Sequence, residues 1–121
     1  MGLSKSTVSV TIATGTALSG AVSLGAKVLS AIIIPSAWTA AALTFQASEN
    51  GTTWYDLYDD GGTEVSIVSG AVAASRRISL DPSAFASVSF VKVRSGVTAT
   101  PVAQAADRVL TLVTRNFYAL S

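Results

Sequence analysis

The chain has 121 residues with a formal net charge of +1, and only 12% of its residues are charged, against roughly 25% in typical soluble domains. It contains no cysteine and no histidine, which excludes disulfides, thiolate nucleophiles and any catalytic dyad or triad that needs an imidazole. We therefore expect one domain over residues 1–121 that is not an enzyme, holds no cofactor, and has too scattered a positive charge to bind nucleic acid.

Residues 1–6 are small and polar, and we expect a short, loose N-terminal arm without the apolar core of a secretion signal. The longest strongly apolar run, residues 31–34, is far below the roughly 20 residues that span a bilayer. We therefore predict a soluble protein made in a cytoplasm, with no membrane partner.

The first half of the chain shows strand patterns separated by glycine. Val8, Val10 and Ile12 alternate with polar residues and predict a strand over 7–12. A short strand is expected at 21–24. Residues 27–34 are apolar on both faces near their end, which predicts a strand either central in a two-layer core or part of a subunit contact. Pro35 ends it.

The segment 42–69 predicts two successive hairpins. Residues 42–48 alternate between apolar and polar side chains, and Asn50 and Gly51 favour a type I′ turn. The chain is expected to return through a strand at 54–58, turn again at 59–62, and leave through 65–67.

The second half predicts three further strands, at 75–80, 88–94 and 107–115. Asp81 and Pro82 predict the N-cap and first position of a single helical turn. Apolar residues occupy both parities of 88–94, which indicates a bulge near Phe90 or burial on both faces. Eight or nine short strands without a long helical period predict an all-β antiparallel sandwich of jelly-roll type.

Three clusters are candidate sites. Asp56, Asp59, Asp60 and Glu64 surround one predicted turn and would suit either calcium or a solvated turn. Trp54 and Tyr58 should share a strand face, as a sugar-stacking patch or as core and interface aromatics. The cations form a candidate contact surface for an acidic partner, or a solubilising face: Lys5, Arg76, Arg77, Lys92 and Arg94.

The sparse charge suggests that other copies or partners cover much of the surface. Strands that are apolar on both faces, together with the apolar C-terminal tail, predict the oligomer interface. Its candidate residues are Ile32, Ile33, Ile34, Leu110, Leu112, Phe117 and Tyr118.

Ser48, Asn50, Gly51 and Trp54 resemble the strand–turn–strand pattern of discoidin-like carbohydrate-binding sandwiches. That resemblance implies a carbohydrate-binding or host-adhesion module, and it carries over no binding residue.

A longer resemblance runs through VTIATGTALSGAVSLG, IIIPSAWTAAALTFQASENGTTWYDLYDDGGTEV, ISLDPSAFASVSFVKVRSG and ADRVLTLV. These segments resemble small structural proteins of tailed bacteriophages. The resemblance implies a virion protein, above all a decoration (cement) protein on the capsid surface, with the major capsid protein as partner. A homo-oligomer follows from that role, with a trimer favoured by three-fold lattice positions. A tail or connector component is the further alternative.

Overall fold

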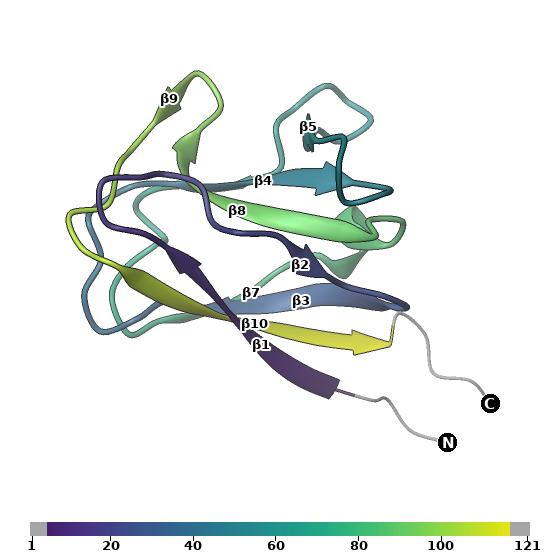
Figure 1. Ribbon diagram of the computed structural model, residues 1–121, viewed down its shortest axis with the longest axis horizontal. Helices are drawn as coiled ribbons and strands as arrows, with labels where there is room; N and C mark the ends of the chain where they lie inside the picture. Colours follow the sequence, from purple (N-terminus) through teal and green to yellow (C-terminus); the bar gives the residue numbers. More distant parts are fainter. Residues whose placement is uncertain (1–4, 117–121) are drawn as a thin grey trace.

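The computed structural model describes residues 5–116, which form two packed antiparallel sheets (Figure 1). The lower sheet in Figure 1 has the order β1-β10-β3-β7, and the upper sheet has the order β2-β8-β4-β5. In the upper sheet β6 also pairs with β4, and β9 with β8. The strands are β1 (Lys5–Ile12), β2 (Val22–Ser23), β3 (Lys27–Ile33), β4 (Leu43–Ser48), β5 (Tyr55–Asp56), β6 (Ser66–Ile67), β7 (Arg77–Ser79), β8 (Phe90–Val97), β9 (Thr100–Pro101) and β10 (Arg108–Asn116).

The strand order is that of a jelly roll. β5 and β6 both pair with β4 and share one position in the upper sheet, while β9 is the return of a hairpin from β8. With these merged, successive strands alternate between the sheets except at the step from β4 to β5. This gives the two four-stranded sheets of the double Greek key. The predicted all-β sandwich is confirmed, with β9 as the short strand that the sequence pattern did not reveal.

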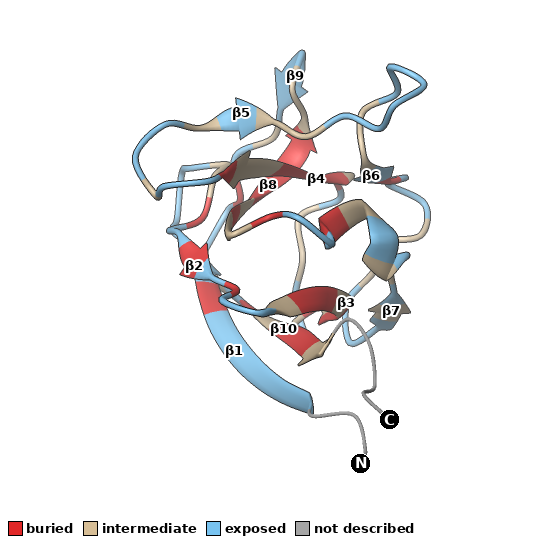
Figure 2. Ribbon diagram, turned by 90° about the vertical axis from the view of Figure 1, so that its right-hand side faces the viewer, coloured by how far each residue is buried: buried red, intermediate tan, exposed pale blue. Residues whose placement is uncertain are grey.

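The core fills the space between the sheets. Leu43 and Phe45 point inward from β4 and are fully buried, as are Leu110 and Leu112 from β10. The ring of Phe85 packs edge-on against Phe45, with centroids 5.1 Å apart. Figure 2 shows the buried residues in the facing layers of the two sheets.

A β-bulge interrupts the alternation of β3 near its start, while Ile33 near its end lies on the outer face in regular register. Val113 pairs with Ala31, but the next residue of β10 pairs with Leu29, so Ser30 is the extra residue. Both Val28 and Leu29 are buried beside it. β3 lies between β10 and β7, so the central-strand alternative is correct.

Of the two alternatives for 88–94, the bulge near Phe90 is absent from the pairing of β8 with β4. β8 pairs with β4 without interruption, from Phe90 opposite Ser48 to Ser95 opposite Leu43. Burial on both faces explains the apolar residues of both parities: Val91 and Val93 are buried toward the core, and Phe90, of the opposite parity, is half-buried.

The turn after β4 is not the predicted type I′ turn. That turn needs positive φ at both central residues, whereas Gly51 has φ +80° and Asn50 has no positive φ. Side chains hold the loop instead. Ser48 Oγ accepts from the amides of Asn50 and Gly51, and Asn50 Oδ1 accepts from those of Thr52 and Thr53.

The predicted helical turn is present as a 3₁₀ helix, η1 (Pro82–Phe85), whose N-cap Asp81 accepts from the Ser83 amide. The predicted arm is too long. Lys5 and Ser6 already belong to β1, where they pair with Arg115 and Thr114, and residues 1–4 lie outside the described residues.

Candidate functional site

Arg94 is buried on the outer side of the upper sheet. Its neighbours on β8, Val91 and Val93, face the core, so alternation along the strand directs Arg94 to the opposite side. There the segments around β5, Glu64 and Thr98 cover it, and only 6% of the residue is exposed.

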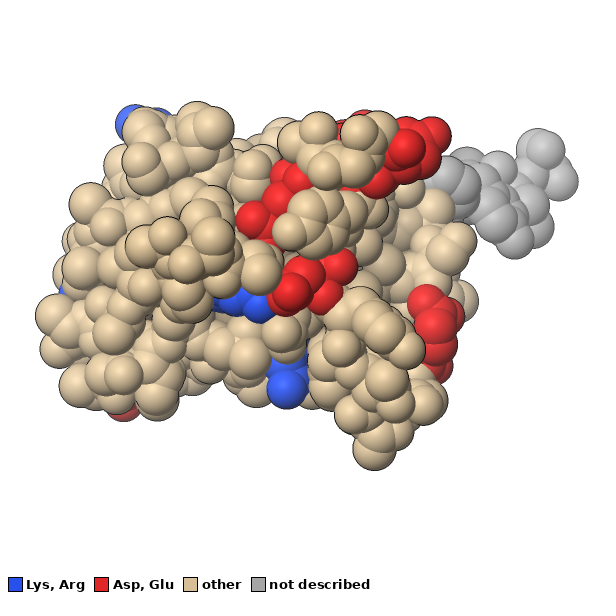
Figure 3. Space-filling view, turned by 90° about the horizontal axis from the view of Figure 1, so that it is seen from above, with Lys and Arg blue, Asp and Glu red and all other residues tan. Residues whose placement is uncertain are grey.

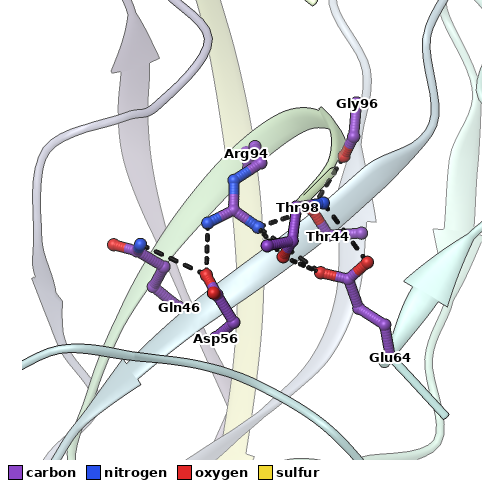
Figure 4. Close-up of polar contacts among 7 residues, drawn as sticks. All are labelled: Thr44, Gln46, Asp56, Glu64, Arg94, Gly96 and Thr98. Carbon is purple, nitrogen blue, oxygen red and sulfur yellow. Dashed lines mark hydrogen bonds and ion pairs between the residues drawn. The ribbon is translucent and has the colours of Figure 1, made fainter. Parts of the chain in front are cut away.

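A ring of polar groups surrounds the guanidinium (Figure 4). Arg94 Nη2 donates to Asp56 Oδ1 at 2.5 Å, and Nη1 lies 3.4 Å from Glu64 Oε2. Nη1 also donates to Thr98 Oγ1 at 2.7 Å and to Thr44 Oγ1 at 3.3 Å. The Thr98 hydroxyl donates in turn to Glu64. The cluster joins four separate segments of the chain.

One cation between two carboxylates leaves this cluster with one net negative charge. The hydrogen bond from Arg94 holds the pKa of Asp56 below its ordinary value of 3.8, with a smaller contribution from Gln46. Every group of the cluster is therefore already engaged by another. We interpret the cluster as a brace that fixes the segment between β4 and β6, not as a reactive centre.

An open pocket of about 460 Å³ lies next to this brace. Tyr55 and Tyr58 line it and are 65% and 50% exposed. Leu57 and Val88 are apolar walls, and Glu49 stands at its edge as a carboxylate. The other lining residues come from the end of β4, from β5 and from η1: Ala47, Ser48, Asp56, Ser83, Ala84 and Ser87.

The acidic residues gather around this side of the molecule. Five of the seven lie between positions 49 and 64, namely Glu49, Asp56, Asp59, Asp60 and Glu64. Figure 3 shows red side chains collected on this face, with little blue among them. The pocket therefore has negative surroundings, which disfavour an anionic ligand.

The calcium alternative does not fit these carboxylates. Asp56 and Glu64 bind Arg94, and Asp59 Oδ1 accepts from the amides of Gly61 and Thr63 within its own turn. Over residues 5–116, no group of three or more acidic side chains is placed to hold a metal ion.

The lower sheet has an outer face whose central rows carry little charge. Its rows follow from the register: Thr7, Val113, Ala31 and Ser79 form one row, and Ser9, Thr111, Ile33 and Arg77 the next. Val109 lies beside Thr11 and is 50% exposed. Arg77 is the single charged residue in these rows, and its side chain donates to Ser79. Val113 and Ala31 are themselves buried, and the neighbouring row carries two further cations, Lys5 opposite Arg115.

The predicted oligomer interface is largely core. Ile32, Ile34, Leu110 and Leu112 have at most 1% of their surface exposed within one molecule, so these side chains cannot contact a second copy. The pattern that suggested an interface reflects a buried sheet. Ile33 is half-buried on the outer face, and Phe117 and Tyr118 lie outside the described residues.

The predicted cationic contact surface is not one surface. Arg94 is buried in the brace and is unavailable to a partner. Lys92 is half-buried, with its ammonium 4.5 Å from the centre of the Trp54 ring. Lys5, Arg76 and Arg77 are exposed, but Lys5 is on β1 and the two arginines are at β7, the opposite edge of the lower sheet.

The aromatic patch contains a different pair from the predicted one. Trp54 is half-buried against Lys92 and does not line the pocket, whereas Tyr58 does so together with Tyr55. Alternation along a regular strand places Tyr55 and Tyr58 on opposite faces, and β5 is only two residues long. The irregular chain after β5 brings them to one pocket, which sequence periodicity does not reveal.

No helix within residues 5–116 is long and apolar enough to cross a membrane.

The sequence matches no family model and no curated protein. Among solved structures, the fold is similar to that of the SPBc2 prophage-derived protein YomS, with a TM-score of 0.50 and 13% identity over 92% of this chain and 94% of that one. The K2 cleaved adhesin domain of Lys-gingipain reaches a TM-score of 0.33 with 12% identity over 81% of this chain and 60% of that one, too low to carry an argument. The likeness to YomS establishes a shared fold.

Proposed function

We propose that this chain is a structural protein of a tailed-bacteriophage virion, and specifically a decoration protein that binds the outside of the head and stabilises contacts between capsomers. The observation that carries the proposal is the outer face of β1-β10-β3-β7, where Lys5, Arg115 and Arg77 lie at the margins and the central rows are formed by uncharged, mostly small and β-branched side chains. The centres of protein–protein interfaces are depleted of charged residues, and the low charge of these central rows supports a contact with another protein.

Two further observations support a phage role. A protein that shares this fold over nearly the whole of both chains is prophage-derived. The sequence segments that resemble phage virion proteins also span most of the chain. The lack of histidine and cysteine agrees with a role that needs surface and rigidity instead of chemistry.

The mechanism follows from the forces on a filled head. A packaged genome pushes outward on a shell held by non-covalent contacts, and a rigid domain that bridges two capsomers adds buried area where they would separate. Stable contacts of this kind bury about 1,600 Å² in total. Self-association would multiply that area, and the three-fold positions of an icosahedral lattice suit a trimer.

The proposal is tested by adding the purified protein to heads that lack it and measuring co-sedimentation. Thr111 lies in the central rows of this face, between Ser9 and Ile33. We expect Thr111→Glu to bind heads at least tenfold more weakly, with an unchanged circular dichroism spectrum. The control is Thr52→Glu, in the exposed loop after β4, which should bind normally. Full occupancy by Thr111→Glu, or loss only with Thr52→Glu, would contradict the proposal.

A second candidate function is saccharide binding in the pocket of Tyr55 and Tyr58. Exposed aromatic rings beside an apolar wall can stack on the C–H face of a sugar, and the neighbouring carboxylate and serine hydroxyls can bind its hydroxyl groups. The negative surroundings favour a neutral or amino-bearing sugar. This function would make the protein an adhesion module on a head or tail fibre.

A glycan array of neutral, amino-bearing and acidic oligosaccharides separates this candidate from the first. We expect neutral or amino-bearing glycans to be retained, and the double variant Tyr55→Ala/Tyr58→Ala to lose them. Val68→Ala, which truncates a 68%-exposed residue outside the pocket, should retain them. If the natural protein retains no more glycan than the double variant, saccharide binding in this pocket is ruled out.

A further inference from the structure

The free edge of β1 is a long and unprotected strand edge. β1 has eight residues and pairs with β10 without interruption from Lys5 to Ile12. Within residues 5–116, no strand pairs with its other edge. Residues 5–9 are all exposed, and Figure 2 shows the same stretch as a pale ribbon extending beyond the rest of the sandwich.

Proteins normally protect such edges. Proline, central charges, bulges or very short strands prevent unwanted pairing. β1 has none of these, since its one charge is Lys5 at its first residue. The opposite edge of the same sheet is protected: β7 has only three residues, and Arg76 and Arg77 stand at its start.

Val8 is an apolar residue left half covered at this edge. It has the parity of Val10 and Ile12, which face the core and are 6% and 0% exposed. Val8 itself is 38% exposed at the edge strand, although Leu112, its partner on β10, is fully buried. A second strand laid along this edge would cover Val8.

We propose that the β1 strands of two copies pair antiparallel across a two-fold axis, with Val8 opposite Val8 of the second copy. The two four-stranded sheets would then form one sheet of eight strands. This two-fold contact is separate from the three-fold self-association proposed above. It can fail while attachment to heads stands, because it is tested with the purified protein alone.

The register follows from the faces of the strand. Residues directly opposite each other point to the same side, so core-side residues must meet core-side residues. With Val8 on the axis, Ser6 meets Val10, Thr7 meets Ser9, and Lys5 meets Thr11. The two partly exposed valines then cover one another, and the outer faces of the two sheets continue across the axis.

Charge also agrees with this register. The two Lys5 residues lie six positions apart along the paired strands, about 20 Å at 3.4 Å per residue. That distance exceeds the Debye length of about 8–10 Å in physiological salt, so their repulsion is screened. A two-fold contact joins copies in pairs, and in a trimeric protein it would link neighbouring trimers.

Single cysteines test the register without background, because the natural chain has none. Cα atoms directly opposite each other are about 4.5–5.5 Å apart, within disulfide reach. We therefore expect Val8→Cys to form a disulfide-linked dimer under mild oxidation. Thr11→Cys, whose copies would lie about 20 Å apart, should not. A mixture of Lys5→Cys and Thr11→Cys should yield the heterodimer. Cross-linking that is strongest at Ser9→Cys or Thr11→Cys would overturn the proposed register.

Light scattering at micromolar concentrations tests the contact itself. Val8→Lys places two like charges opposite each other, so we expect the natural protein to associate in pairs and this variant to lose that association. The control Val68→Lys changes an exposed valine elsewhere and should associate normally. A natural protein that is monomeric overturns the proposal. If the natural protein is monomeric and Val8→Lys binds heads more weakly than it does, the edge of β1 is occupied by a capsid segment instead of a second copy.

Discussion

At the scale of single residues, Arg94 has the most consequential environment. Its guanidinium is removed from water by burial, which is costly for a charge unless partners replace the lost hydration. Asp56 and Glu64 supply that replacement on two sides, and Thr44 and Thr98 occupy further donor directions. Removing the cation would leave two carboxylates facing each other in a half-buried site.

We expect Arg94→Met to lower the free energy of unfolding by about 3 kcal/mol, the lower end of the range for breaking a buried pair. Urea denaturation measures it. Lys92→Met on the same strand is the matched control and should cost less than about 1 kcal/mol. The triple variant Arg94→Met/Asp56→Asn/Glu64→Gln should recover part of the loss, because no unpaired charge remains. A triple variant no more stable than Arg94→Met would contradict this account.

Because the pKa of Asp56 is lowered by folding, part of the folding stability depends on pH in the acid range. Its folded pKa lies below the ordinary 3.8 because Arg94 stabilises the carboxylate. Between the folded and the ordinary pKa, the folded state therefore holds fewer protons than the unfolded chain. The contribution of Asp56 to the folding stability is complete above the ordinary pKa, and it is lost as pH falls through the folded pKa.

Denaturation midpoints against pH, for the natural protein and Asp56→Asn, measure this part. We expect a constant difference between about pH 5 and pH 7, and a shrinking difference below about pH 4. In an Arg94→Met background the same substitution should no longer show that loss, since the cause of the lowered pKa is gone. A stability difference between the natural protein and Asp56→Asn that grows toward low pH would contradict a lowered pKa of Asp56.

At the scale of elements, the hairpin from β8 to β9 depends on one backbone position. Gly96 has φ +94°, and a Cβ placed there would lie 2.6 Å from the Thr100 carbonyl oxygen. Its amide donates to Ala42, and its carbonyl accepts from the Thr44 hydroxyl. The close approach positions Thr98 beside Glu64, so the hairpin and the brace depend on the same glycine.

Gly96→Ala should therefore be severely destabilising, by more than about 2 kcal/mol or to the point of insoluble expression. Gly25→Ala separates the two causes. Gly25 also has a positive φ, +61°, but nothing lies within 4 Å of its Cβ position. We expect that variant to cost about 1 kcal/mol, from the backbone conformation alone. Equal melting temperatures for the two variants would show that the close approach is unimportant.

At the scale of the whole molecule, Gln104 ties loops at one end of the sandwich. It is 1% exposed. Its Nε2 donates to the Thr39 carbonyl and the Ser95 hydroxyl, while Oε1 accepts from the Thr39 amide and Arg108 Nε. Its main chain adds bonds to Gly15 and Thr16. One side chain thus connects segments that belong to both sheets.

We expect Gln104→Ala to cost about 3 kcal/mol, because it opens a cavity and leaves buried donors and acceptors without partners. Thermal unfolding followed by circular dichroism measures it. Gln46→Ala is the matched control, since that half-buried glutamine makes a single side-chain bond to Asp56, and it should cost less than about 1 kcal/mol. Similar losses for both variants would refute the role of Gln104 as a tie.

The sequence alone determined the features that depend on near neighbours. Alternation placed most strands within a few residues, and Asp81 and Pro82 specified the helical turn, because side-chain period and capping are local properties. The low charge and the missing histidine and cysteine are properties of composition, and they limit the classes of function open to the chain whatever its fold.

Only the tertiary structure decided which apolar residues are core and which cations are available. Ile32 and Leu112 have the pattern of an interface strand, and pairing in a central position buries them. Arg94 has the chemistry of a surface residue, and a segment about thirty to forty positions earlier covers it. The free edge of β1 and the pocket of Tyr55 and Tyr58 also depend on long-range packing. The physical reason is the same in each case. The periodicity of a strand sequence shows which residues share a face, whereas the burial of that face depends on which distant segments pack against it.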